Sequence, residues 1–438
     1  MADKATIRPV AWADYPAIQA LLRQARWPQR SLAGWDWVWQ QNPARQALLA
    51  QHEATESDTV TAPLGWVIVN EGDGDKPIVG YLGNIQQQFY LHDPTPGPTN
   101  ATGWHTLATC TSYYVDPAWR AKSIGLMRPF FLQKGISAAF STTANAHSAT
   151  VYELYKAQAL HDPGYRQTVL WLGDETRLCR KGLRKSLLPL LGATLLERCR
   201  PLIAQIAKPL GYALRLLRPL LGATPPRLAY GGDVKLCAIT EVDSRFDSLW
   251  QKMIARPGLW LDRRAATWRW RLQDPDQQGQ LALYAAINQQ NQLDGYLVLA
   301  RYTCKTNLQP RAYLLDFVLD PTLPTNMGAA TSAALLHAAV ADCRQHSLVV
   351  LEAQRFSHAS DLFRYPHGGY LRSMAQTHTS SHYLRLLKPA GNATTGLQAA
   401  TSHGWSITAI EGDFWYGLTA FGQEVSPSVA PLEMRSGD

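Results

Sequence analysis

Four short motifs occur twice along the 438-residue chain, in the same order. Each copy has a Trp-x-Trp pair followed by Asn-Pro or Asp-Pro, then Gly-Tyr-Leu, then an apolar run that ends in Asp-Pro, and finally a Leu-aromatic-basic tripeptide. The paired segments are 37–43 with 268–275, 80–82 with 295–297, 115–117 with 319–321, and 154–156 with 362–364. Motifs repeated in register indicate an internal duplication. The chain is therefore expected to fold as two similar units in tandem.

The pattern inside each half predicts a mixed α/β fold. The apolar runs at 106–115 and 312–319 end at the repeated Asp-Pro and predict strands, and 124–134 carries apolar side chains at helical spacing. Each half therefore contains strands, a helix, a further strand and a helix, which favours a mixed sheet flanked by helices. We expect a first half at 1–172, a helical linker at 173–232, a second half at 233–388, and a C-terminal strand and tail at 389–438.

A basic segment rich in leucine and proline separates the two halves. Between 176 and 227, eleven Lys and Arg residues face a single Glu, whereas the net charge of the whole chain is +8. Prolines at 189, 201, 209 and 219 predict several short amphipathic helices rather than one long helix, because proline disrupts a helix interior. Three interpretations are open: a solvated helical linker, a surface for an anionic membrane, and a nucleic-acid site. A single aromatic residue, Tyr212, disfavours the last.

Several classes of protein are disfavoured by the composition. No run of 18 uncharged apolar residues is present, so we expect no membrane-spanning helix, and the N-terminal residues do not resemble a secretory signal. Six scattered cysteines argue against a zinc ribbon or a disulfide framework and favour a reducing compartment. We therefore expect a cytoplasmic protein, with peripheral contact at the inner face of the membrane as an option.

The clearest chemical signal lies at 115–125, where a strand passes through an Asp-Pro turn into a helix. Backbone N–H groups and the helix dipole at such a place attract an anion, for example a pyrophosphate. The small residues Ala121, Ser123 and Gly125 would let phosphates approach the backbone, and Arg120 and Lys122 would add charged contacts. The alternative is an ordinary strand-to-helix turn with two solvated cations.

This segment resembles the acyl-CoA signature of the GNAT superfamily of N-acyltransferases, Val-x-Pro-x-x-Arg-x-x-Gly-x-Gly. Residues 7–18 are similar to that family's first strand and helix, 77–81 to its central strand, and 154–160 to its late helix end. The tandem arrangement resembles a bacterial subgroup associated with exopolysaccharide genes. The resemblance implies two GNAT-like domains joined by the basic helical segment, and acetyl-CoA or another acyl-CoA as co-substrate, with no metal.

The resemblance also places the acyl-CoA contacts on the strand end and the loop that follows. These positions are Tyr114, Val115, Arg120, Ala121, Lys122, Ser123, Ile124 and Gly125. Two departures are mild: Ser123 replaces the first glycine of the motif, and Ala159 replaces the glycine of the late helix end. In the second half the motif has no arginine and contains Pro324, which lacks an N–H. We therefore expect the second half to keep the fold without binding CoA.

In this family an amine attacks the thioester directly, and N–H groups such as those around Tyr114 and Val115 stabilise the oxyanion. The resemblance assigns protonation of the thiolate to Tyr155, with Tyr152 as the alternative because Asn145 precedes it at the family's spacing. The general base is open between His105, Asp116 and a water relay. We favour a structural turn role for Asp116.

The sequence thus predicts an acyl-CoA-dependent N-acyltransferase, most simply an acetyltransferase, acting on an amine of a small molecule, an aminosugar or a lipid-linked acceptor. The alternatives are a non-catalytic, membrane-associated adaptor built on a degenerate GNAT pair, and a thioester hydrolase or decarboxylase. The tryptophans of the repeats are predicted to be core residues rather than a sugar platform. His378 and His382 are predicted at a strand end rather than in a metal site, and 405–418 is predicted as a turn and strand.

Overall fold

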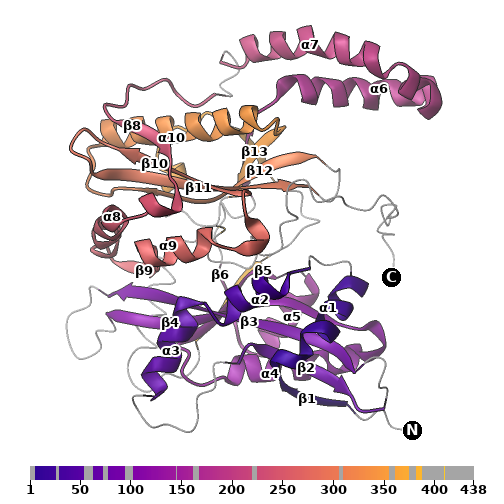
Figure 1. Cartoon of the computed structure of the whole chain (residues 1–438), viewed down its shortest axis with the longest axis vertical. Coiled ribbons are helices and arrows are strands. Elements are labelled where there is room, and N and C mark those ends of the chain that lie inside the picture. Colours follow the sequence, from indigo (N-terminus) through magenta and orange to yellow (C-terminus); the bar gives the residue numbers. More distant parts are fainter. Residues whose placement is uncertain are drawn as a thin grey trace.

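The computed structural model describes residues 5–25, 29–53, 63–72, 77–93, 102–144, 146–160, 167–219, 224–304, 309–354, 361–373, 381–386 and 409. These residues form two mixed sheets with helices on their faces (Figure 1). The predicted mixed α/β fold, with two sheets in tandem and a helical segment between the halves, is confirmed.

The first sheet is antiparallel except for one parallel pair, β4 with β5. Its strands, in spatial order, are β1 (Ala5–Pro9), β2 (Gly65–Asn70), β3 (Ile78–His92), β4 (Gly103–Val115), β5 (Ala138–Ala144), β15 (Ser381–Leu386) and β6 (Gln158–Leu160). Strand β9 (Gly258–Leu261) also pairs with the far end of β3. The predicted strand at 106–115 is confirmed within β4.

The second sheet has the same pattern, with β12 and β13 as its parallel pair. Its strands, in spatial order, are β14 (Tyr370–Ser373), β7 (Gln167–Leu172), β13 (Val350–Gln354), β12 (Pro310–Leu319), β11 (Leu293–Thr303), β10 (Leu281–Ile287) and β8 (Asp233–Leu236). The predicted strand at 312–319 is confirmed within β12.

Each sheet contains one or more strands from the other half, and β9 of the second half is one such strand of the first sheet. Strand β7, the last strand of the first half, lies between β13 and β14 of the second sheet. Strand β15, the last strand of the second half, lies between β5 and β6 of the first sheet. The boundary predicted at residue 172 thus falls at the end of a strand that pairs in the second sheet, and the domain limits themselves stay a prediction.

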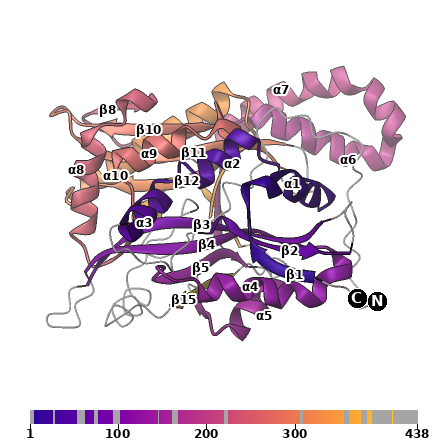
Figure 2. The same cartoon turned by 60° about the horizontal axis from the view of Figure 1, so that its bottom comes forward.

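Helices fill the space between the sheets and cover their outer faces (Figures 1 and 2). Between the sheets lie α1 (Tyr15–Gln24), α2 (Leu32–Trp39), α8 (Ser244–Ile254) and α9 (Ala265–Leu272), and their apolar side chains form a core shared by both halves. Helices α4 (Ser123–Leu132) and α5 (Ala146–Leu154) close a second core on the outer face of the first sheet. Helix α10 (Thr325–Gln345) closes a third core over the second sheet, and α3 (Pro43–Glu53) packs beside β3.

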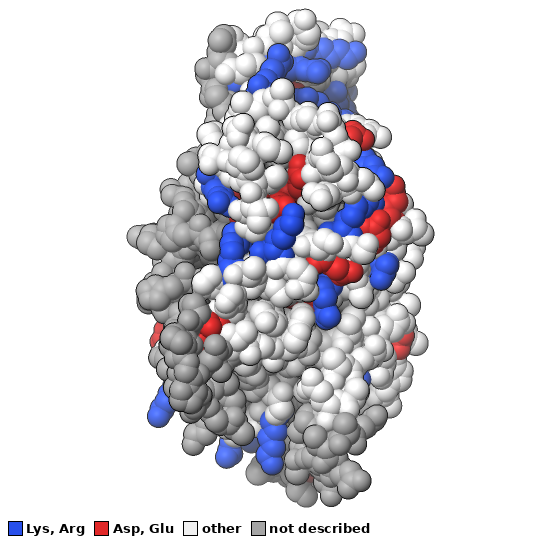
Figure 3. Space-filling view, turned by 90° about the vertical axis from the view of Figure 1, so that its left-hand side faces the viewer, with Lys and Arg blue, Asp and Glu red and all other residues white. Residues whose placement is uncertain are grey.

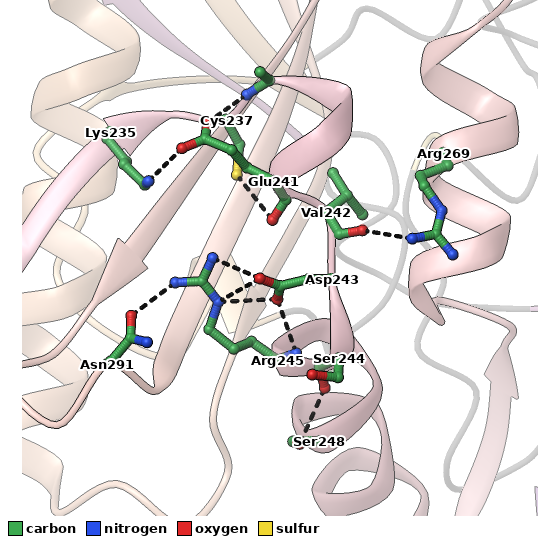
Figure 4. A network of polar contacts seen from close by, with 11 residues as sticks. Lys235, Cys237, Glu241, Val242, Asp243, Ser244, Arg245, Ser248, Arg269 and Asn291 are labelled. Carbon is green, nitrogen blue, oxygen red and sulfur yellow. Dashed lines mark hydrogen bonds and ion pairs between the residues drawn. The ribbon is translucent and has the colours of Figure 1, made fainter.

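The duplication extends to contacts that the sequence motifs did not include. In the first half, Asp14 at the end of the 3-10 helix η1 (Trp12–Asp14) accepts the N–H of Ala11 and pairs with Arg8 on β1. In the second half, Glu241 at the end of η3 (Ile239–Glu241) accepts the N–H of Ala238 and pairs with Lys235 on β8 (Figure 4). The shared pattern is a basic residue, an alanine three positions later and an acid three positions after that. Both copies fix the turn from the first strand into the first helix.

The register of the repeated tryptophans differs from the one predicted. Residues 31 and 264 are the N-caps of α2 and α9, which aligns Trp35 with Trp268 and Trp37 with Trp270. Trp35 packs against Tyr81 of the Gly-Tyr-Leu motif, and Trp268 packs against the equivalent Tyr296. The prediction that paired Trp37 with Trp268 was therefore wrong by two residues. Trp35, Trp37, Trp39 and Trp268 are buried, as predicted for core residues.

The basic segment forms a hairpin of two helices, α6 (Glu175–Arg198) and α7 (Arg200–Leu217). Pro201 lies in the first turn of α7, so a helix begins there as predicted. The prediction was wrong for Pro189 and Pro209, which lie inside α6 and α7. Both prolines are exposed, so water can reach the carbonyl groups that they leave unpaired. The kink in α6 occurs instead at Gly192, where φ is +68°. Among the described residues, no helix has the length and apolar character needed to cross a bilayer.

Candidate functional site

Strands β4 and β5 of the first sheet diverge after a short stretch of pairing. Their parallel contacts join Leu107–Thr109 to Ala138–Phe140, while β4 continues to Val115 and β5 continues to Ala144 beside β15. A bulge accompanies the divergence, because the register between β3 and β4 shifts near Ser112, whose φ is +54°. A bulge bends its strand and increases the local twist. The end of β4 is thereby led away from β5.

The N–H group of Val115 points away from β3, toward the edge of β4 that paired with β5 earlier in the strand. The next residue, Asp116, donates its N–H to the carbonyl oxygen of Val79 on β3, 2.8 Å away. Successive N–H groups of a strand point to opposite edges, so the N–H of Val115 points away from β3. The predicted oxyanion donor therefore faces the gap between β4 and β5.

The predicted loop is a 3-10 helix, η2 (Pro117–Lys122), that runs directly into α4. Asp116 caps η2 by accepting the N–H of Ala118 at 3.0 Å, and Gln24 donates to its other oxygen. This geometry agrees with the turn role favoured for Asp116. The N–H of Ser123 donates to the carbonyl oxygen of Arg120 within the turn.

The side chains of this turn face solvent. Arg120, Ala121, Lys122 and Ile124 are exposed, and Ser123 and Gly125 are partly buried. Within the described part of the chain, neither Arg120 nor Lys122 has an acidic partner. A methyl group added at Gly125 would lie 3.1 Å from Cδ1 of Ile7, so that β1 closes this side of α4. The start of α4 thus carries two cations directed to water.

Tyrosine hydroxyls surround the start of α4. Tyr155 donates to the carbonyl oxygen of Ile124 at 2.9 Å, and its ring stacks on Phe131. Tyr113 of β4 donates to the carbonyl oxygen of Ser123 at 3.0 Å, and burial raises its pKa to about 12. The sequence prediction did not include Tyr113. Its only signal was the Tyr-Tyr-Val that ends the strand.

The alternative proton donor, Tyr152, occupies a different environment. It is buried in the core under α4, and its hydroxyl lies 2.6 Å from Sγ of Cys110 on β4. Tyr155 is partly exposed at the edge of the same core. Tyr114 points to the opposite face of the sheet and packs against the core that the two halves share.

The other residues considered for catalysis lie apart from this turn or outside the described residues. Nδ1 of His105 lies 3.2 Å from Oγ of Ser137, near the other end of β4. Asn145, His378 and most of 405–418 fall outside the described residues, and His382 lies on β15 as predicted for a strand. In the described part of the chain, no three His, Cys, Asp or Glu side chains are grouped to hold a metal ion.

The equivalent place in the second half is occupied by the protein itself. Strands β12 and β13 also pair only over Arg311–Tyr313 and Val350–Glu352, and Asp320 donates to the carbonyl oxygen of Asp294 as Asp116 does to that of Val79. The N–H of Leu319, the counterpart of Val115, however donates to the buried carboxylate of Asp361 at 3.0 Å. The start of α10 is blocked as well, because a methyl group at Gly328 would lie 2.3 Å from the hydroxyl oxygen of Tyr365.

No family model matches the sequence, and no curated protein matches it. Among solved structures, the chain is similar to N-myristoyltransferase of Saccharomyces cerevisiae with bound myristoyl-CoA, at 9% identity and a TM-score of 0.47, over 89% of this chain and 80% of the other. A structure of that enzyme with myristoyl-CoA and inhibitors gives 9% identity and a TM-score of 0.46, over 88% and 80%. A conserved protein of unknown function from Enterococcus faecalis, described as a probable N-acyltransferase, gives 8% identity and a TM-score of 0.44, over 90% and 74%.

Proposed function

We propose that this protein is an acyl-CoA-dependent N-acyltransferase of the GNAT type whose first half binds the acyl-CoA. The observation that carries the proposal is the gap between β4 and β5, with the N–H of Val115 directed into it and the start of α4 beside it. A gap between two strands lets an extended thioester arm hydrogen-bond to the strand edge as an added strand would. The N–H of Val115 would then stabilise the oxyanion that forms at the thioester carbonyl.

The start of α4 would hold the diphosphate of CoA. Its N-terminal dipole favours an anion, and Arg120 and Lys122 place two cations there that have no acidic partner among the described residues. Tyr114, Ala121, Ser123, Ile124 and Gly125 supply the strand and backbone surface along which the CoA would lie. The 3-10 geometry of η2 already uses the N–H of Ser123. Because this N–H group is not free to bind phosphate, we expect the side chains of Arg120 and Lys122 to provide a larger share of the binding.

The reaction follows from this placement. The nitrogen of a neutral amine attacks the thioester carbonyl carbon, a C–N bond forms, and the C–S bond breaks to release the CoA thiolate. The amine proton passes to water or to a base, and the thiolate takes a proton from Tyr155. The partial exposure of Tyr155 and its hydrogen bond at the start of α4 favour it over the buried Tyr152 as this acid.

We infer that the acyl group is short, with acetyl as the first candidate, and that the acceptor is an amine of a small molecule, an aminosugar or a lipid-linked intermediate. The exopolysaccharide association of the resembling subgroup motivates the aminosugar. The hairpin of α6 and α7 motivates the lipid link and a position at the inner face of the membrane. All six cysteines are free thiols, which agrees with the reducing cytoplasm that we propose as the compartment.

Calorimetric titration with acetyl-CoA, and with acyl-CoAs of increasing chain length, tests the proposal. We expect micromolar binding to the wild type and at least tenfold weaker binding to Arg120→Ala, whose side chain is exposed. Arg128→Ala is the matched control, because Arg128 is exposed on the same helix but lies outside the proposed site. Equal binding by both variants would reject the site, and no binding of any acyl-CoA by the wild type would favour the adaptor.

Turnover with an amine panel then tests the chemistry. Tyr155→Phe is expected to lower kcat by about 10²-fold or more while acyl-CoA binding is retained, since general acids contribute on that scale. Tyr152→Phe removes only the hydroxyl beside Cys110 and should leave kcat within a few fold of wild type. Release of CoA without an amide product would indicate a hydrolase instead.

A further inference from the structure

The outer helix of the α6–α7 hairpin presents an apolar face to solvent. Helix α7 forms the outer edge of the molecule in Figure 1, and α6 lies between it and the second sheet. Exposed helix faces of globular proteins are normally polar. Here the residues that point outward are 43–60% exposed and apolar: Leu202, Ile206, Leu210, Leu216 and Leu217. The adjacent face, with Ile203, Ala207 and Gly211, is buried.

The base of the hairpin is attached firmly to the second half. Arg218 forms a buried ion pair with Glu175 at 2.6 Å and also donates to the carbonyl oxygen of Leu172. Arg177 donates to the carbonyl oxygen of Ser347 at 2.9 Å. A methyl group at Gly211 would lie 2.5 Å from Oγ1 of Thr176, so the two helices touch closely here. The apolar face of α7 is therefore held outward by the fold.

Cations are also clustered on α6, and Figure 3 shows Lys and Arg gathered at the end of the molecule that carries the hairpin. They line a hollow of about 550 Å³ whose walls extend from the first turn of α6 to the start of α7 and include Gln309 of the second half. The six cations of the hollow are Arg177, Arg180, Lys181, Arg184, Lys185 and Arg200. The one carboxylate of its lining is Glu197, which pairs with Arg184. The hollow is thus strongly electropositive and of a size that admits a phosphate headgroup.

We propose that the α6–α7 hairpin docks on an anionic phospholipid bilayer, with the apolar face of α7 in the headgroup–acyl boundary and lipid phosphates at the cations of α6. An interfacial amphipathic helix combines such an apolar face with a basic one, and polybasic segments are attracted to anionic lipid. Helix α7 is about 27 Å long at 1.5 Å per residue, and it would lie along the surface rather than cross it.

Two other occupants fit the surface less well. Single-stranded nucleic acid is bound by aromatic side chains interleaved with cations, whereas Tyr212 is the one aromatic residue of the hairpin. A second copy of the chain would bring two sets of α6 cations toward each other across a symmetric contact, with one carboxylate for each six cations. An anionic bilayer would both bury the apolar face of α7 and pair its lipid phosphates with the cations of α6.

Co-sedimentation of the full chain with vesicles tests the proposal and does not depend on the acyltransferase function. We expect binding to phosphatidylcholine vesicles that contain 30% phosphatidylglycerol, and at least tenfold weaker binding to phosphatidylcholine alone. The charge variant is Arg180→Gln, Lys181→Gln, Arg184→Gln, Lys185→Gln. Its matched control removes four exposed cations elsewhere: Arg23→Gln, Arg128→Gln, Lys134→Gln, Arg227→Gln.

The charge variant should bind the anionic vesicles at least tenfold more weakly than the control. A third variant, Leu202→Gln, Ile206→Gln, Leu210→Gln, should lose the part of the binding that persists at high salt. Circular dichroism melts report whether each variant is folded. Because this readout needs no acyl-CoA, the vesicle result stands or falls separately from the proposed acyltransferase function. Negligible vesicle binding by the wild type, or equal loss in charge variant and control, would overturn the proposal. A shift from dimer to monomer in the third variant without vesicle binding, or tighter binding to RNA than to vesicles, would overturn it too.

Discussion

Trp37 and Trp270 occupy equivalent positions in the two halves and lie face to face, with ring centroids 4.5 Å apart and planes 13° from parallel. Each indole N–H donates to the backbone carbonyl oxygen of the other residue, at 2.8 and 3.2 Å. Exchanging the two halves leaves this contact unchanged. The pair therefore marks a local two-fold axis between α2 and α9, and the buried Arg30–Asp274 ion pair lies beside it.

Removing this pair should destabilise both halves together. Trp37→Ala is expected to lower the free energy of unfolding by about 3–5 kcal/mol, because it empties a buried site and leaves a carbonyl of the other half unpaired. Trp12→Ala, at a tryptophan that is 39% exposed, is the control and should cost roughly 1 kcal/mol. Urea unfolding measures both. A double-mutant cycle with Trp270→Ala should give a coupling of about 1 kcal/mol, and a coupling of zero would contradict the symmetric contact.

The sequence predicted the repeat but not the exact alignment of the tryptophans in its two copies. Trp35, Trp37 and Trp39 are spaced two apart, so Trp268-x-Trp270 can be aligned with either pair. Only the helix caps and the contacts of Trp35 with Tyr81 and Trp268 with Tyr296 distinguish the two alignments. The strands, α4 and the Asp-Pro turns could be predicted because each follows from local pattern and turn chemistry.

The exchange of β7 and β15 could not be predicted, because alternation along a strand does not reveal which sheet it joins. The gap between β4 and β5 could not be predicted from the sequence either. It depends on a bulge at Ser112, where φ is positive, and serine is not a residue type that indicates positive φ. Helix breaks were wrongly predicted at Pro189 and Pro209, because an exposed helix tolerates an unpaired carbonyl group that a buried helix would not. Tyr113 was missed because consecutive strand residues face opposite sides of the sheet, and the sequence does not reveal that Tyr113 and not Tyr114 faces α4.

Neither half should fold alone, because each sheet includes a strand of the other half. Trp171 and Val169 on β7 are fully buried in the core of the second sheet, so a fragment of residues 1–172 would expose them. We expect separate fragments 1–172 and 173–438 to lack cooperative unfolding, and co-expressed fragments to form a stable complex. Circular dichroism melts and co-purification measure this. A cooperative transition in the isolated 1–172 fragment would show that the exchanged strands are dispensable.

Ser112 tests the link between the bulge and the site. A β-branched residue is strongly disfavoured at positive φ, so Ser112→Val should lower the free energy of unfolding by about 2 kcal/mol and weaken acyl-CoA binding. Ser112→Gly fits the same backbone, and its lower strain is offset by its larger loss of chain entropy, so its stability should stay within about 0.5 kcal/mol of wild type. Thermal melts and calorimetry measure the pair. Normal binding by Ser112→Val would separate the bulge from the site.

Asp361 predicts a specific pH dependence. Burial raises the pKa of its carboxyl above the usual value of 3.8, so between about 3.9 and its folded pKa the folded state binds more protons than the unfolded state. Its contribution to stability is therefore greatest at low pH and falls as pH rises through this window. Asp361→Asn removes the titration and keeps an acceptor for the N–H of Leu319. The difference in unfolding free energy, wild type minus variant, should decrease as the pH rises above about 4, and an increase would contradict the assignment.

Two glycines of α6 should respond to alanine in opposite directions. Gly192 has φ of +68° and open space where the methyl group of an alanine would lie, so Gly192→Ala meets backbone strain alone. It should cost about 1–3 kcal/mol, because φ of +68° combined with ψ of 166° is a backbone conformation populated almost only by glycine. Gly182 lies within the helix and also has open space, so Gly182→Ala should stabilise α6 by about 0.5–1 kcal/mol. Hydrogen exchange of α6 amides measures both. If the two substitutions shift protection in the same direction, the kink is set by packing against α7 and not by the glycine.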